Sequence, residues 1–138
     1  KDVVQESVFP RALYETKAAI RWIRANAETY RFDPNRIAVL GTSADGQIAR
    51  LLATTSHKPD TEDLSMGNAN FSSAVQAAII GAGANREKPT WICDKFSTKT
   101  ESHVHNQYPP ILILHGTIDP KEIFDFTNKV FGISIGKE

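Results

Sequence analysis

One serine in this chain stands where a nucleophile is expected, between a short apolar run and a helix-forming stretch. The segment Arg36–Gln47 reads Arg-Ile-Ala-Val-Leu-Gly-Thr-Ser-Ala-Asp-Gly-Gln, so Ser43 follows Gly41 by two residues. This order predicts a strand, a sharp turn that carries the serine, and a helix. The chemistry would be attack on an acyl carbonyl, and the N–H of Ala44 at the helix start could donate to the developing oxyanion.

Ser43 also has a plainer interpretation, because serine is favoured at helix N-caps without any chemistry. The strand expected before it and the helix expected after it favour the catalytic interpretation. Asp45 complicates that interpretation, since a negative charge near an oxyanion opposes the transition state and a Cβ at this position crowds the turn. An aspartate in the first turn nevertheless suits the helix dipole, so Asp45 can favour the helix and hinder the catalyst.

A catalytic serine needs a base, and the base needs an acid that orients it. Asp119 follows the third apolar run and could be that acid, although Asp119-Pro120 is also a strong turn signal. All four histidines precede it in the sequence: His57, His103, His105 and His115. The expected order along the chain is serine, acid, histidine, and no histidine follows Asp119. No catalytic histidine is therefore identified in this chain.

Neither a metal ion nor a cofactor is expected. His103 and His105 are two residues apart, but no third ligand is spaced to complete a metal site. Gly81-Ala82-Gly83 is too short for a phosphate loop. Cys93 is the only cysteine, so it excludes an internal disulfide, and it is interpreted as a packing residue.

The elements that must position these residues alternate between strands and helices. Strands are expected at 36–40, 74–80 and 110–115, and helices at 9–30, 44–55 and 121–130. Continuous apolar runs indicate strands buried on both faces. Their alternation with helices predicts an α/β fold, a three-layer sandwich with a mainly parallel sheet. In such sheets chemistry lies at the carboxyl ends of the strands, where Ser43 and Asp119 both fall.

Other segments are expected at the surface. The basic residues of the first helix, Lys17 and Arg21 among them, are assigned to its solvent side. The polar segment 56–73 is expected to be a surface excursion, and 84–108 an irregular insertion.

Composition limits the classes of partner. The chain has 138 residues, is 41% hydrophobic and carries no net charge, which fits one soluble domain. Neutrality argues against nucleic acid as a partner, and no apolar run is long enough to span a membrane. Because the chain begins almost directly with a helix, we expect residues in front of Lys1.

Four segments together carry a resemblance to a known family. The chain is similar to the central and later part of an α/β-hydrolase of the esterase/lipase group. The likeness is closest to the carboxylesterase branch that includes feruloyl-esterase-like and acetylxylan-esterase-like enzymes. The segments are Lys-Ala-Ala-Ile-Arg-Trp-Ile-Arg-Ala-Asn-Ala at Lys17–Ala27, Tyr-x-x-Asp-Pro-x-Arg-Ile at Tyr30–Ile37, an elbow at Gly41–Gly46, and Pro-Pro-x-Leu-x-x-His-Gly-Thr-x-Asp at Pro109–Asp119.

The resemblance implies that Ser43 is the nucleophile and Asp119 the acid of a catalytic triad. It also places the family's His-Gly-Gly oxyanion motif upstream of this chain and its catalytic histidine downstream, while Asp45 replaces a family glycine. Residues 1–138 are accordingly expected to form a single partial α/β-hydrolase domain, without the N-terminal strands and the C-terminal histidine segment.

The expected function is that of a serine carboxylic-ester hydrolase, acting on short-chain or carbohydrate-linked esters in its complete form. The isolated chain is expected to be nearly inactive. Two alternatives stay open: a degenerate, non-catalytic binding module, and a related serine peptidase. The partner would be a small-molecule or carbohydrate ester, not nucleic acid or a membrane, and exposed sheet edges could promote self-association.

Overall fold

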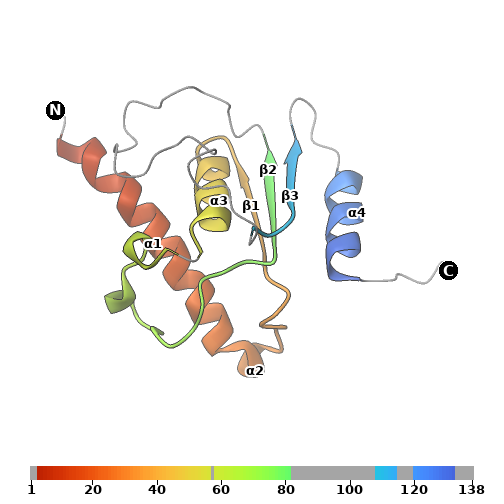
Figure 1. Ribbon diagram of the computed structural model, residues 1–138, viewed down its shortest axis with the longest axis horizontal. Helices are drawn as coiled ribbons and strands as arrows, with labels where there is room; N and C mark the ends of the chain where they lie inside the picture. Colours follow the sequence, from red (N-terminus) through yellow and green to blue (C-terminus); the bar gives the residue numbers. More distant parts are fainter. Residues whose placement is uncertain (1–2, 57, 82–107, 115–119, 133–138) are drawn as a thin grey trace.

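Among the described residues, a parallel sheet of three strands forms the centre of the fold (Figure 1). The computed structural model describes residues 3–56, 58–81, 108–114 and 120–132. The strands are β1 (Ala38–Thr42), β2 (Ala77–Gly81) and β3 (Ile111–Leu114), in the order β1-β2-β3. Both neighbouring pairs are parallel, so the carboxyl ends of all three strands lie at the same edge of the sheet.

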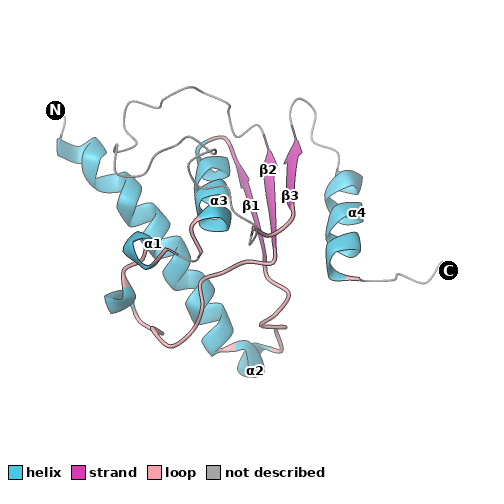
Figure 2. Ribbon diagram, viewed as in Figure 1, coloured by secondary structure: helices cyan, strands magenta, loops and turns pink. Residues whose placement is uncertain are grey.

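Helices pack around this sheet, as the alternation of elements predicts (Figure 2). α3 (Ala44–Thr54) contacts β1 and β2, and α1 (Val3–Ala25) packs on α3. α4 (Pro120–Phe131) contacts β2 and is drawn beyond β3. The arrangement confirms the predicted fold class, a three-layer α/β architecture with a parallel sheet.

Short elements complete the connections. The helix expected at 9–30 is two helices, because the chain turns at Asn26 and continues as α2 (Ala27–Tyr30). Two short 3-10 helices, η1 (Pro59–Thr61) and η2 (Leu64–Met66), lie within the segment expected to be a surface excursion. The insertion expected at 84–108 lies almost entirely outside the described residues.

The hydrophobic core lies between the sheet, α1 and α3. Its buried members come from all of these elements and their connections: Leu13, Ile20, Ile37, Leu51, Leu52, Ala53, Val75 and Ala78. β2 is buried at all five positions, as expected for a strand covered on both faces. β1 does not meet that expectation, since it is an edge of the described sheet and Leu40 is 54% exposed.

Two basic side chains expected on the solvent side are instead completely buried. Lys17 and Arg21 have no exposed surface. The side chain of Arg21 donates to Glu62 Oε2 at 2.7 Å, to the Asp63 carbonyl at 2.9 Å and to the Gly67 carbonyl at 3.1 Å. The segment 58–73 thus folds back over α1 and supplies acceptors for both cations, which is why the solvent-side assignment was wrong.

One connected group of polar side chains is named here the Glu62 network. Its members are Lys17, Arg21, Thr61, Glu62 and Ser73. Lys17 Nζ donates to Thr61 Oγ1 at 2.7 Å and to the Thr55 carbonyl at 2.8 Å, and lies 3.6 Å from Glu62 Oε1. Ser73 Oγ donates to Glu62 Oε1 at 2.5 Å. Buried charges are tolerated when they are paired and hydrogen-bonded, and each member of this network is.

We expect the titration of Lys17 to make stability rise with pH. Burial lowers the pKa of Lys17 to about 8, although the Glu62 charge opposes the shift. An unfolded chain holds this lysine at a pKa of about 10.4, so between these values the unfolded state binds more protons. The free energy of unfolding, relative to a Lys17→Met variant, should rise by about 3 kcal/mol across that window. Below the folded-state pKa of about 8, this contribution is constant.

Urea denaturation of both proteins at several pH values measures this difference, because the other titrating groups cancel. A Lys121→Met variant, which removes a lysine that is 76% exposed, is the control and should give a nearly flat difference. The free energy of unfolding of the wild type relative to Lys17→Met could instead fall as the pH rises. That result would mean that Glu62 raises the pKa of Lys17 more than burial lowers it.

Candidate active site

Ser43 lies on the turn between β1 and α3 in an unusual backbone conformation. Its φ is 55° and its ψ is −119°, a region that residues with a Cβ rarely occupy. The N–H of Ser43 donates to the Gly81 carbonyl at 3.1 Å, which ties the turn to the end of β2. The Ser43 side chain is exposed at the carboxyl edge of the sheet. The strand, turn and helix predicted from the sequence are all present.

Ser43 occupies the N-cap position of α3, but it does not act as an ordinary cap. An N-cap serine normally has an extended backbone, and its oxygen accepts a hydrogen bond from the first helical turn. Here φ is positive and the side chain makes no capping hydrogen bond. The plain capping interpretation therefore fails, and the strained conformation requires another explanation.

Gly41 explains how the turn can be so tight. A Cβ at Gly41 would lie 2.5 Å from the Asp45 carbonyl carbon and 2.9 Å from the Gly46 nitrogen, and closer still to the Asp45 oxygen. These are backbone atoms that cannot rotate away. Asp45 itself is helical and exposed, and it is not among the described residues with positive φ. The crowding expected at position 45 is thus found at Gly41.

The start of α3 places the N–H of Ala44 beside Ser43. The first N–H groups of a helix have no partner within the helix, and the macrodipole makes that end positive. Among the described residues, no backbone carbonyl accepts from the N–H of Ala44. This N–H could therefore receive a hydrogen bond from an oxyanion formed at Ser43.

The other residues expected at the site lie outside the described part of the chain. They are Asp119, the four histidines His57, His103, His105 and His115, and Cys93. Ser43 and Ala44 are therefore the site residues that the structure brings together.

Within the described ranges, no group of three or more His, Cys, Asp or Glu residues could hold a metal ion. None of the helices in the described ranges is long and apolar enough to cross a membrane.

Gln47 was not anticipated from the sequence. It lies one helical turn after Ser43 and is 7% exposed, and its Oε1 is buried with no hydrogen-bond partner in the part of the chain that the structure describes. An unpaired buried carbonyl is unfavourable by about 1–3 kcal/mol, so its presence beside the turn is notable. A glutamine at this place in an amphipathic helix gives no signal of burial in the sequence.

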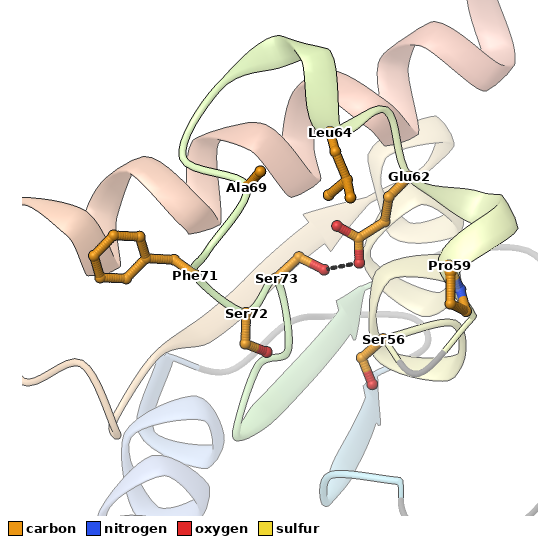
Figure 3. Close-up of a pocket in the computed structure, with 8 residues that line it drawn as sticks. All are labelled: Ser56, Pro59, Glu62, Leu64, Ala69, Phe71, Ser72 and Ser73. Carbon is orange, nitrogen blue, oxygen red and sulfur yellow. Dashed lines mark hydrogen bonds between the residues drawn. The ribbon is translucent and has the colours of Figure 1, made fainter.

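A cavity of about 300 Å³ lies away from Ser43, beside the Glu62 network (Figure 3). Its lining includes Glu62, Leu64, Phe71 and Ser73. Ser73 precedes β2 whereas Ser43 follows β1, so in this parallel sheet the cavity and the serine lie at opposite strand ends. The Glu62 carboxylate is already bound by Arg21 and Ser73, which leaves the cavity no free charged group from that network.

Known proteins resemble this chain over most of its length. A family model described as BD-FAE matches residues 2–85, more than half of the 138. Esterase LipQ of Mycobacterium tuberculosis is 28% identical over 134 residues, which covers 81% of this chain and 31% of LipQ. The chain therefore spans about a third of the length of that relative.

Solved structures show the same likeness. Esterase 2 of Thermogutta terrifontis, in a form phosphoramylated by tabun, aligns with a TM-score of 0.61 and 25% identity over 87% of this chain and 47% of the esterase. A truncated form of a carbohydrate esterase from gut microbiota aligns with a TM-score of 0.63 over 93% of this chain and 57% of that one. At 22% identity, the second likeness concerns the fold alone.

Proposed function

The chain belongs to the BD-FAE family, and from that membership we propose that Ser43 is the nucleophile of a carboxylic-ester hydrolase. The observation that carries the proposal is the conformation of Ser43, which is strained, exposed and free of any capping role. Strain of this kind persists where the surrounding structure and function require it. The relatives named esterase support the same reaction class.

The proposed reaction is acyl transfer in two steps. In the complete enzyme, a histidine that is not identified in this chain takes the hydroxyl proton of Ser43 while Oγ attacks the ester carbonyl carbon. The tetrahedral oxyanion accepts a hydrogen bond from the Ala44 N–H and then collapses, so that the alcohol leaves with the proton from the histidine. Water attacks the acyl-serine in the same way and releases the acid. Asp119 is proposed to orient the histidine.

The proposed substrate is a short-chain or carbohydrate-linked ester. The carbohydrate part of this proposal is supported by the name of one structural relative, a carbohydrate esterase. The sequence motifs support a more specific proposal, that the enzyme belongs to the acetylxylan-esterase-like and feruloyl-esterase-like branch.

The whole 138 residues are proposed to act as one partial domain of this enzyme. Self-association is proposed through the sheet edges, where Leu40 and Ile113 are 54% and 70% exposed.

A fluorophosphonate probe and nitrophenyl acetate test this function in the chain as it stands. The serine oxygen attacks phosphorus and fluoride leaves, so the probe reports nucleophilicity directly. We expect slow labelling of Ser43, about tenfold or more above the exposed Ser65, because oxyanion contacts retain residual catalysis without a base. Turnover of nitrophenyl acetate should stay near the buffer rate, since no histidine follows Asp119.

Mass spectrometry of peptides from the labelled protein separates the two serines, with Ser43→Ala as the control. Fast turnover by the chain would contradict its expected inactivity. Labelling of Ser43 no faster than that of Ser65 would contradict its role as nucleophile. If an Asp45→Gly variant also showed no preference for Ser43, the alternative of a degenerate binding module, which Asp45 favours, would take its place.

A further inference from the structure

Asp45 places a single negative charge next to the proposed nucleophile. It is the only charged residue between Ile37 and Ala49 in the sequence. In the structure it lies in the first turn of α3, and its side chain is exposed, as is that of Ser43. Asp45 takes part in none of the ion pairs among the described residues.

The sign of the local field follows from two opposing contributions. The amino end of α3 contributes about half a positive charge, and an ionised carboxylate contributes a full negative one. At equal distance from an approaching reagent, the carboxylate therefore contributes more to the field than the helix end does. Because Ser43, Ala44 and Asp45 are all exposed, an approaching molecule meets this field before it reaches Oγ.

We propose that Asp45 is a specificity-determining residue that makes this site select neutral or cationic esters and reject esters that carry a carboxylate near the reacting carbonyl. The proposal rests on the proposed function of Ser43. A unit charge about 7 Å away in water-like surroundings changes an encounter rate by roughly threefold for each charge on the reagent. Cationic and anionic substrates of the same shape should therefore differ by roughly tenfold.

A thiol at position 43 measures this field without requiring catalysis. In a Cys93→Ser background, a Ser43→Cys substitution leaves one thiol, whose thiolate attacks a small disulfide and releases the other half as a thiolate. Cystamine is the cationic reagent, dithiodipropionate the anionic one, and hydroxyethyl disulfide the neutral reference. The neutral reagent corrects for changes in thiol ionisation and access, so the ratio of cationic to anionic rates reports charge alone.

The expected result is a rate ratio that falls by about fivefold to tenfold when Asp45→Asn is added, at an ionic strength of about 20 mM. The fall should shrink at about 1 M salt. An Asp45→Glu variant keeps the charge and should keep the ratio. Asp60→Asn removes an exposed charge beyond the far end of α3, which is about 16 Å long, and should have no effect.

A ratio unchanged within twofold by Asp45→Asn would overturn the proposal, and so would an equal fall in the Asp60→Asn control. This experiment and the fluorophosphonate labelling can fail separately. If Ser43 is labelled as expected but the thiol ratio does not move, the charge selection is wrong and the ester hydrolase proposal stands. If the ratio moves but Ser43 is not labelled, the field is present without the proposed catalyst.

Discussion

An Arg21→Met variant is expected to lose about 3–5 kcal/mol in its free energy of unfolding. The guanidinium has no exposed surface, and it holds Glu62 and two backbone carbonyls of the segment 58–73. Its removal leaves Glu62, which is only 11% exposed, with Lys17 at 3.6 Å and Ser73 as partners. Breaking one partner of a buried pair costs far more than the pair itself contributes. Urea denaturation followed by circular dichroism measures the loss.

The matched control lies on the same helix. Arg11 pairs with Glu15 at 2.7 Å, but their side chains are 73% and 55% exposed. Arg11→Met should therefore change stability by less than about 1 kcal/mol, as is usual for surface ion pairs. Equal losses in the two variants would show that the Glu62 network is no stronger than an exposed pair. The position of segment 58–73 over α1 would then need another cause.

A Gly41→Ala variant is expected to destabilise the protein by about 2–4 kcal/mol and to disturb Ser43, the proposed nucleophile, as well. The new Cβ would meet the backbone of Asp45 and Gly46, so α3 must move relative to β1. That movement changes the strained conformation of Ser43, which depends on the same turn. Denaturation measures the first effect, and the preference of the fluorophosphonate for Ser43 over Ser65 measures the second.

A Gly132→Ala variant is the control that separates the effect of steric crowding at Gly41 from the effect of replacing any glycine by alanine. Gly132 has φ +63°, but a Cβ there would meet nothing within 4 Å. The strain of a left-handed residue alone should be unfavourable by about 1–2 kcal/mol and should leave the labelling of Ser43 unchanged. If Gly41→Ala were no more harmful than Gly132→Ala and the serine kept its reactivity, the close approach at Gly41 would not shape the site.

Local sequence patterns correctly predicted the main strands and helices of this protein and their arrangement in a parallel sheet. The apolar run ending at Gly41, followed by Ser43 and a helical stretch, specified a strand, a turn and a helix, and all three are observed. The alternation of strands and helices predicted the parallel sheet, because strand and helix periods are set by near neighbours along the chain. The motifs also identified the family, which the match over residues 2–85 bears out. The roles of Ser43, Ala44 and Asp119 stay predictions.

Tertiary structure alone decided the burial of charge and the shape of the turn. Lys17 and Arg21 look like solvent-facing residues of an amphipathic helix, yet Glu62 reaches Arg21 from 41 positions away in the sequence. The crowding predicted at position 45 depends on which backbone atoms meet across the turn, and it falls on Gly41. A residue's own neighbours determine which element it joins. Whether its side chain is buried, paired or strained depends on segments that only the folded chain brings together.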